Sequence, residues 1–230
     1  MRLGIIFDTE TNGKIVSWKL PLTGLTLKND REAVLANYPR IAQIAWEIVD
    51  LDTGKVLGSQ QFMIKPDNWT IPTVEELQEQ IKRRRENNEK NVRDEEAFFF
   101  VNNNMSTERC EKEGVPISEV LPLIVEEINK ADIIVAHNSA FDMPVLKCEM
   151  IRYGFKAKNS PVEICTMKSS VDYCKIPHAN GRGYKWPQLG ELYKLLFSED
   201  MGLAHDAFAD TTAARKCFFK LIELKQIILK

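Results

Sequence analysis

The chain has 230 residues, and its 31 lysines and arginines nearly balance its 33 aspartates and glutamates, which gives a net charge of −2. With 44% hydrophobic residues, a chain of this length can bury a sizeable core, which excludes a disordered protein. The charge balance excludes attraction of nucleic acid by the overall field of the protein, so such a partner would have to be held by a local patch or by metal ions.

The first part of the sequence predicts β-strands. Residues 3–8 form a short, almost wholly apolar run, which is typical of a central strand buried on both faces. After an irregular stretch over residues 11–39, two segments at residues 41–51 and 56–64 are rich in β-forming residues. A turn signal at residues 52–54 separates them, so we expect these two segments to form a hairpin.

A dense run of charges follows at residues 73–96. We expect a single domain over residues 1–230 that carries this segment as a charged, helical or mobile insertion. Two interpretations of the insertion remain open. It is either a solvated helix, or a basic contact with nucleic acid through residues 82–85.

The second part of the sequence predicts helices that alternate with strands. A buried strand is expected at residues 133–136 and an edge strand at residues 162–165. Apolar spacing and capping signals predict helices at residues 117–131, 141–153, 189–197 and 206–224. This order of elements indicates an α/β domain with a mixed sheet.

The sequence also bears on the compartment of the protein. No apolar run approaches the ~18 residues of a membrane span, and the run at residues 3–7 is too short for a secretory leader. The five cysteines are odd in number and no two lie two to four residues apart, which argues against a disulfide framework and against a structural zinc site. We therefore expect buried thiols in a cytoplasmic protein without a membrane contact.

Two carboxylates follow the first predicted strand. Asp8 and Glu10 are two residues apart, so both side chains point the same way in an extended chain. An acid-x-acid pattern is weak evidence in a chain with 33 acids, but this one lies between an apolar strand and a turn, where open α/β sheets place ligand sites. Two carboxylates this close repel each other, and a divalent cation removes that penalty.

Three further residues are candidates to join this pair. Asp142 is expected in the first turn of the helix after the second buried strand. His205 and Asp210 flank the start of the last helix, for which Asp206 has the composition of an N-cap. A histidine can accept a proton near neutral pH. Each of these residues alone also has a structural interpretation, whereas His137, at a strand end, is expected to make only a local hydrogen bond.

Together these residues resemble the DEDDh exonuclease family, which includes the proofreading subunits of bacterial replicative DNA polymerases. The similarity extends over nearly the whole chain, and several ordered motifs carry it rather than any single one. The motifs are FDTETNG at residues 7–13, YPRIAQIAW at 38–46, HNSAFD at 137–142, YKWPQL at 184–189 and HDAFAD at 205–210.

The resemblance implies a ribonuclease-H-like fold, with a five-stranded mixed sheet flanked by helices. It implies 3′→5′ hydrolysis of single-stranded DNA to nucleoside 5′-monophosphates. By the same resemblance, the expected role is proofreading or repair, and a polymerase is a possible partner. By resemblance, His205 is the general base, and two divalent ions, Mg²⁺ or Mn²⁺, serve the attacking and leaving oxygens. The metal ligands that it implies are Asp8, Glu10, Asp142 and Asp210, and the substrate contacts are Thr9, Thr11, Asn138 and Phe141.

Two positions depart from the family pattern. Lys14 stands where many relatives have an aromatic or aliphatic residue that wedges the terminal base, and Asn103 stands where many have a histidine.

Two alternatives to a DNA exonuclease also remain open. They are an exoribonuclease that acts on RNA ends with the same acids, and a non-catalytic nucleic-acid or polymerase-binding module on the same fold. The sequence does not determine the oligomeric state, the processivity or the preferred metal.

Overall fold

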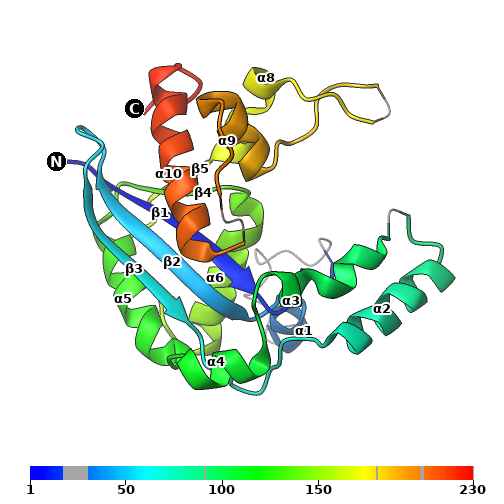
Figure 1. Ribbon diagram of the computed structural model, residues 1–230. Coiled ribbons are helices and arrows are strands. Elements are labelled where there is room, and N and C mark those ends of the chain that lie inside the picture. The colour runs from blue at the N-terminus through cyan, green and yellow to red at the C-terminus, as the bar shows by residue number, and fades with distance from the viewer. Residues whose placement is uncertain (18–30, 91, 180, 203–204, 230) are drawn as a thin grey trace.

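The computed structural model describes residues 1–17, 31–90, 92–179, 181–202 and 205–229. Within these residues a five-stranded sheet has the strand order β3-β2-β1-β4-β5 (Figure 1). β1 pairs antiparallel with β2 and parallel with β4, and β5 lies parallel to β4 at the edge. The strands are β1 (Leu3–Thr11), β2 (Ile41–Asp50), β3 (Val56–Met63), β4 (Ile133–Ala136) and β5 (Val162–Cys165). The predicted hairpin, the edge strand and the mixed α/β sheet are therefore confirmed.

β1 lies at the centre of the sheet because it is apolar on both faces. Ile5 packs into one core cluster and Ile6 into a second cluster on the opposite face. Asp8 and Glu10 continue the row of Ile6, since residues two apart in a strand point the same way. The strand extends to Thr11, three residues beyond the apolar run, because its pairing with β2 continues that far.

Helices cover both faces of the sheet (Figure 1). α5 (Ile117–Lys130) and α6 (Ser139–Arg152) contribute to the core on the side of Ile5, whereas α9 (Leu189–Phe197) and α10 (Ala207–Glu223) contribute on the side of Ile6. The other helices are short or peripheral: α1 (Arg31–Ala36), α2 (Val74–Glu86), η2 (Asp94–Phe98), α3 (Phe99–Asn102), α4 (Thr107–Glu113), α7 (Thr166–Ser169) and α8 (Val171–Cys174).

The start of α6 and the stretch after β1 differ from what the sequence predicts. α6 begins two residues earlier than expected, because Asn138 adopts a left-handed backbone with φ of 70° and turns the chain directly from β4 into the helix. The stretch predicted to be irregular, residues 11–39, contains the short helix α1. Residues 18–30 of that stretch lie outside the described residues.

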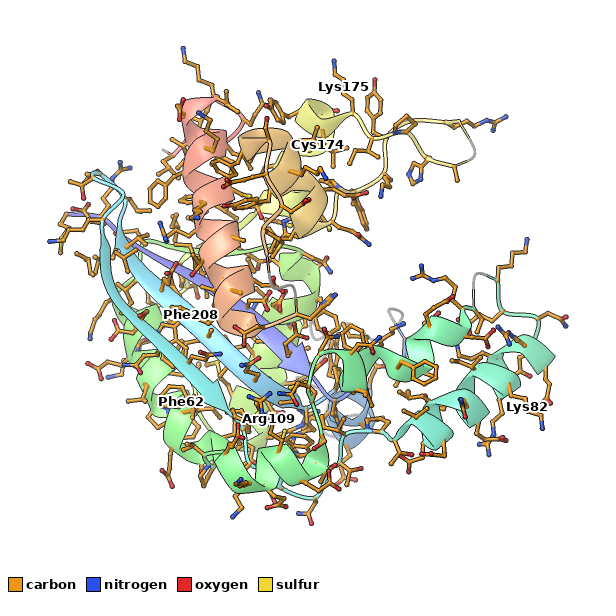
Figure 2. The ribbon with its side chains drawn as sticks, viewed as in Figure 1. Phe62, Lys82, Arg109, Cys174, Lys175 and Phe208 are labelled. Atoms are coloured by element: carbon orange, nitrogen blue, oxygen red, sulfur yellow. The ribbon has the colours of Figure 1, made fainter. Side chains whose placement is uncertain are left out.

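The charged insertion folds as α2 followed by η2, and it projects from the body of the protein (Figure 1). Three of the four basic residues at 82–85 form ion pairs with acids of the same segment. They are Arg83 with Glu79 at 3.3 Å, Arg84 with Glu89 at 2.7 Å and with Glu96 at 2.8 Å, and Arg85 with Asp94 at 2.9 Å. Lys82 is exposed on the outer side of α2 (Figure 2). These pairs favour a solvated helix over a basic contact with nucleic acid.

The cysteines and the helices bear on two further expectations. All five cysteines are free thiols, and four of them are buried. Across the described ranges of the chain, no helix combines the length and the apolar character that crossing a membrane requires.

Candidate metal centre

Asp8 and Glu10 lie on one face of β1 near its carboxyl end. Asp8 is opposite Ala45 and Glu10 is opposite Gln43 in the antiparallel pairing with β2. Both carboxylates are partly buried. They lie on the face of β1 that packs against α10, so the first turn of that helix can reach them.

Asp142 enters the same site from the first turn of α6. Its side chain is only 3% exposed, and its Oδ1 accepts two hydrogen bonds from Thr9, at 3.2 Å from the backbone nitrogen and at 2.7 Å from the hydroxyl. Thr9 lies between Asp8 and Glu10, so it ties the carboxylate of α6 directly to the acidic end of β1.

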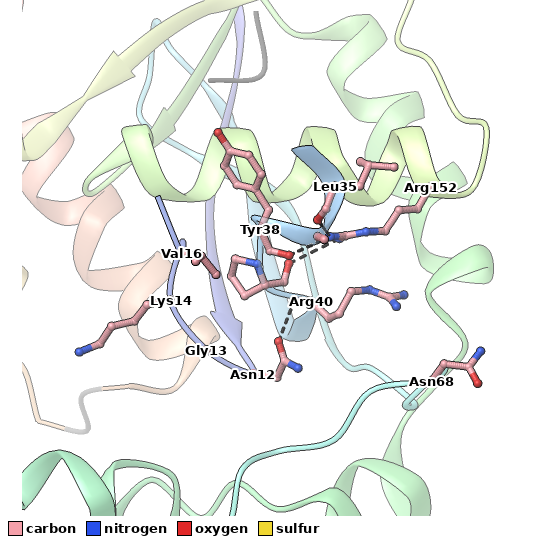
Figure 3. A pocket seen from close by; sticks show the side chains of 11 residues that line it. Asn12, Gly13, Lys14, Val16, Leu35, Tyr38, Arg40, Asn68 and Arg152 are labelled. Atoms are coloured by element: carbon pink, nitrogen blue, oxygen red, sulfur yellow. Dashed lines mark hydrogen bonds between the residues drawn. The ribbon is translucent and has the colours of Figure 1, made fainter. Parts of the chain in front are cut away.

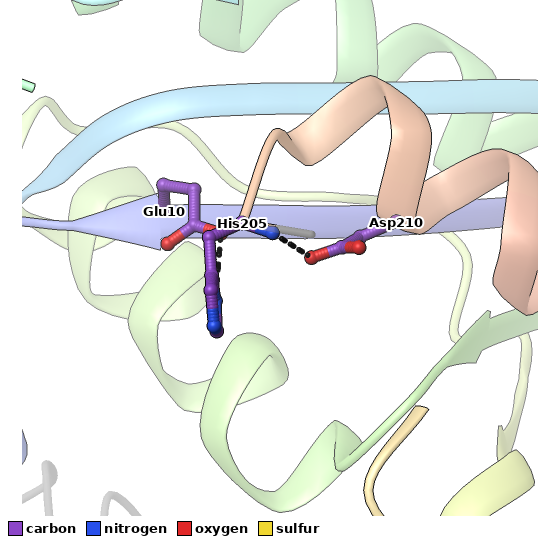
Figure 4. Close-up of side chains that lie close together, drawn as sticks. All are labelled: Glu10, His205 and Asp210. Atoms are coloured by element: carbon purple, nitrogen blue, oxygen red, sulfur yellow. Dashed lines mark hydrogen bonds and ion pairs between the residues drawn. The ribbon is translucent and has the colours of Figure 1, made fainter. Parts of the chain in front are cut away.

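Asp210 and His205 come from the start of α10 (Figure 4). The backbone N–H of His205 donates to Asp210 Oδ2 at 3.1 Å, and the His205 backbone has a left-handed φ of 62°. The imidazole is half exposed, with its Nδ1 3.9 Å from Glu10 Oε1. The ring of Phe99, from α3, packs edge-on against it with 5.0 Å between the ring centroids.

The start of α10 is fixed to the sheet by a set of polar contacts that the sequence analysis missed. Asp206 caps the helix, as predicted, by accepting from the backbone nitrogens of Phe208 and Ala209. Its other oxygen accepts from Gln43 Nε2 at 3.1 Å and from Gln61 Nε2 at 3.2 Å. Gln43 Oε1 also accepts from the backbone nitrogen of Ala207 at 3.1 Å. The signal that could have revealed this role is a glutamine within the apolar run Ile41–Trp46.

The Gln43→Ala substitution should therefore lower the free energy of unfolding by ~1–3 kcal/mol, because it leaves buried polar groups at the helix start without partners. The matched control is Gln61→Ala, which removes one exposed bond to the same carboxylate and should cost under about 0.5 kcal/mol. Urea unfolding measures both values. Equal losses for the two variants would show that Gln43 does not anchor α10.

Burial and mutual repulsion raise the pKa values of all four carboxylates. Burial is the largest cause in each case. The pKa of Asp8 is raised well above its ordinary value, with further contributions from the charges of Asp142, Glu10 and Asp210. The pKa is raised to about 8 for Glu10, to about 7 for Asp142 and to about 6 for Asp210. The charges that raise these pKa values all belong to other carboxylates.

The residues present fit a divalent cation. Among the described residues, Glu10, His205 and Asp210 offer ligand atoms that all lie within 4.8 Å of one another. Asp210 Oδ1 is buried and has no hydrogen-bond partner there, so one hard oxygen ligand is available at the centre of the cluster. A cation would also supply the positive charge that the four carboxylates lack.

We expect the metal-free protein to lose stability as the pH rises from about 4 to about 8. A carboxylate with a raised pKa in the folded state holds its proton longer than in the unfolded state, so its contribution is present below its ordinary pKa and is lost as the pH rises through the folded value. The fall in the free energy of unfolding should be at least about 3 kcal/mol, since one pKa unit corresponds to about 1.4 kcal/mol and the pKa of Asp210 alone is raised from 3.8 to about 6. Thermal unfolding in chelator measures this fall, and saturating Mg²⁺ or Mn²⁺ should reduce it. A stability that is flat over this range would contradict the description of the cluster.

The structure brings together all five residues predicted as metal ligands or general base. The hydroxyls of the predicted substrate contacts Thr9 and Thr11 form hydrogen bonds within the protein. The Thr9 hydroxyl is engaged with Asp142, and the Thr11 hydroxyl donates to the Gly13 carbonyl at 2.7 Å. Both hydroxyls therefore stabilise the strand end, and the substrate contacts of Thr9 and Thr11 stay a prediction. Asn138 and Phe141 lie half-buried around the start of α6.

His137 makes the local contacts expected of it. Its Nδ1 lies 3.0 Å from Thr166 Oγ1 and its Nε2 lies 3.0 Å from the Pro187 carbonyl oxygen. Burial lowers its pKa to about 4, so this imidazole is neutral near neutral pH. It is a structural residue at the end of β4, next to the acidic cluster but not part of it.

A separate pocket of about 400 Å³ lies beside the chain that follows β1 (Figure 3). Arg40 and Arg152 line it, and both pair with Glu149, at 2.7 Å and 3.0 Å. Arg152 also donates to the backbone carbonyls of Leu35 and Tyr38. These bonds give the two arginines a structural role in holding α1 and β2 against α6.

The strand order, with acidic side chains at the carboxyl end of the central strand, defines a ribonuclease-H-like α/β fold. No protein-family model matches the chain, and no curated protein matches it. Solved structures do match over almost the whole chain. Exonuclease I of E. coli in complex with a dT13 oligonucleotide aligns with a TM-score of 0.65 at 16% identity, over 98% of this chain and 42% of that one.

Two other structures give similar values. E. coli Exonuclease I in complex with a dA16 oligonucleotide aligns with a TM-score of 0.64 at 15% identity. Exonuclease I of Methylocaldum szegediense aligns with a TM-score of 0.62 at 17% identity, and each alignment covers 97% of this chain and 41% of the other. The chain thus spans about two fifths of these proteins. At this identity the likeness establishes the fold, and the resemblance to polymerase proofreading subunits stays a prediction.

Proposed function

We propose that this chain is a metal-dependent 3′→5′ exonuclease that hydrolyses phosphodiester bonds at the 3′ end of single-stranded DNA and releases nucleoside 5′-monophosphates. The observation that carries the proposal is the gathering of four carboxylates and one histidine, from β1, α6 and α10, at the carboxyl end of the central strand. The solved structures of the same fold support it, since they are of Exonuclease I and two of them hold DNA oligonucleotides.

The ligand set that we propose is Asp8, Glu10, Asp142 and Asp210. Their oxygens are hard ligands, which suit Mg²⁺ and Mn²⁺. Two such ions, when bound, would supply positive charge to the attacking and leaving oxygens of the phosphodiester. Thr9 orients Asp142 by its two hydrogen bonds, and the backbone N–H of His205 orients Asp210.

His205 is the proposed general base. Burial lowers its pKa below the ordinary value of 6.5, so the imidazole is neutral near neutral pH and can take a proton from the attacking water. The half-exposed ring has access to solvent, and its Nδ1 faces Glu10. The imidazole therefore lies at the border between the carboxylates and the water that would attack.

The test is an end-labelled oligonucleotide assay with purified protein in Mg²⁺, in Mn²⁺ and in chelator. We expect single nucleotides to be released from the 3′ end of single-stranded DNA with either metal, and no product in chelator. A matched RNA oligonucleotide determines the sugar preference. Binding of DNA without any metal-dependent product would contradict the proposal and would identify a non-catalytic binding module.

A further inference from the structure

A hairpin beyond the acidic cluster has the composition of a nucleic-acid contact. It consists of residues 175–179 and 181–188, here called the basic hairpin, and it projects from the body between α8 and α9 (Figure 1). Backbone bonds close it, from Lys185 N to the Ile176 carbonyl at 2.8 Å and from His178 N to the Gly183 carbonyl at 3.2 Å. It is therefore an ordered extension of the fold.

The basic hairpin has a charge opposite to that of the whole chain. No acidic residue occurs between Asp172 and Glu191, whereas Lys175, Arg182 and Lys185 all lie in that interval, in a chain with a net charge of −2. Lys185 is paired with Glu191 at 2.5 Å, and the side chains of Lys175 and Arg182 are exposed. Figure 2 shows Lys175 extending away from the body where the hairpin leaves α8.

Aromatic side chains are exposed on the same element. Trp186 is 63% exposed and Tyr184 is 43% exposed, and Tyr173 lies exposed just before the hairpin. In the described part of the chain, the other exposed aromatic residues are Phe98 and Phe99, and the ring of Phe99 packs against His205. A large aromatic surface left in water is uncommon unless a partner covers it. Flat rings interleaved with cations are the surface on which unpaired bases stack while the phosphates are neutralised.

The base of the hairpin is fixed next to the acidic cluster. The Pro187 carbonyl, one residue after Trp186, is bound by the half-buried His137 at 3.0 Å. His137 directly follows β4, the strand that pairs with β1 on the side away from β2. The basic hairpin and the charged insertion, which contains α2, extend on the same side of the molecule (Figure 1). A strand whose 3′ end lies at the carboxylates can therefore continue along the hairpin.

We infer that the basic hairpin binds the single strand upstream of its 3′ end, with bases stacked on Trp186 and Tyr184 and phosphates near Lys175 and Arg182. This inference rests on the proposed function for the position of the 3′ end. The hairpin would supply affinity for longer strands, since repulsion from the acidic cluster disfavours a polyanion in the absence of metal.

The test measures the dissociation constant of fluorescently labelled oligo(dT) of about 20 nucleotides by anisotropy in Ca²⁺ without Mg²⁺ or Mn²⁺. Trp186→Ala should weaken binding about tenfold or more, and Trp186→Phe should retain most of the affinity, because stacking on one aromatic ring is worth a factor of this size. Lys175→Ala/Arg182→Ala should also weaken binding and should lower the dependence of log Kd on log salt. Each of these substitutions should weaken the binding of a trinucleotide less than it weakens the binding of the long strand.

The matched control is Lys82→Ala/Arg83→Ala, which removes the same charge from the exposed side of α2 and should leave the Kd unchanged. Cleavage of the same oligonucleotide by the unaltered protein in Mn²⁺ tests the proposed function separately. If cleavage occurs but the hairpin variants bind like the unaltered protein, the inference is wrong and the surface serves another partner. If the variants lose binding but no cleavage occurs, the proposed function fails and the binding surface stands.

Discussion

The Asp8→Asn substitution should abolish exonuclease activity and at the same time stabilise the metal-free protein. Activity should fall by roughly 10³-fold or more, since charge stabilisation by a metal centre is worth several kcal/mol and each 1.36 kcal/mol is a factor of ten in rate. Stability in chelator at pH 8 should rise, because the amide removes one charge from a buried cluster in which Asp142, Glu10 and Asp210 repel Asp8. Product release and thermal unfolding measure the two effects.

The control for this change is Asp172→Asn on α8, where the carboxylate is exposed. It should leave the unfolding temperature in chelator almost unchanged, as most surface substitutions do. The combination of lost activity and gained stability is specific to a functional acidic cluster. An Asp8→Asn protein that keeps its activity would remove Asp8 from the mechanism, and one that is destabilised in chelator would contradict the electrostatic account.

The His205→Gln substitution should lower kcat by about 10²–10⁴-fold and leave metal affinity largely intact, because general base catalysis contributes a factor of this size. The structure supports separate roles, since the imidazole is half exposed and the four carboxylates suffice for hard-metal ligation. The rate of the unaltered protein should decrease as the pH drops through the pKa of His205. Because burial lowers this pKa below 6.5, the decrease should occur at a pH below 6.5. The His205→Gln variant should not show this decrease in rate at low pH.

Isothermal titration with Mn²⁺ distinguishes the two roles that the geometry allows for His205. A ring nitrogen of His205 and carboxylate oxygens of Glu10 and Asp210 all lie within 4.8 Å of one another, so the imidazole can also serve as a metal ligand. If His205→Gln loses Mn²⁺ affinity in parallel with activity, the assignment as general base is wrong. Phe99→Ala provides a comparison, because it removes the ring that packs on the imidazole and leaves every proposed ligand in place.

The elements that carry the site were predictable because their signals are local. An apolar run flanked by a turn is enough to predict β1, and the side-chain alternation of an extended strand puts Asp8 and Glu10 on one face. The composition of Asp206 as an N-cap correctly predicts where α10 begins, and Asp210 follows one turn later. The convergence of these acids could be inferred only by adding the parallel pairing of β4 with β1.

The contacts that hold the site together were not predictable, because they join residues far apart in the sequence. Gln43 reaches Asp206 across 163 residues, and Thr9 reaches Asp142 across 133 residues. Phe99 and His205 lie far apart in the sequence, so no local pattern indicates that the two rings pack together. The ion pairs within the insertion were likewise not predictable, because the segment contains many charges of both signs.

Crystals soaked in Mn²⁺ and measured at the manganese absorption edge would test the central claim most directly. We expect anomalous peaks within ligand distance of the oxygens of Asp8, Glu10, Asp142 and Asp210, at the carboxyl end of β1. No peak between these side chains at saturating Mn²⁺, or ions bound only elsewhere on the surface, would contradict it.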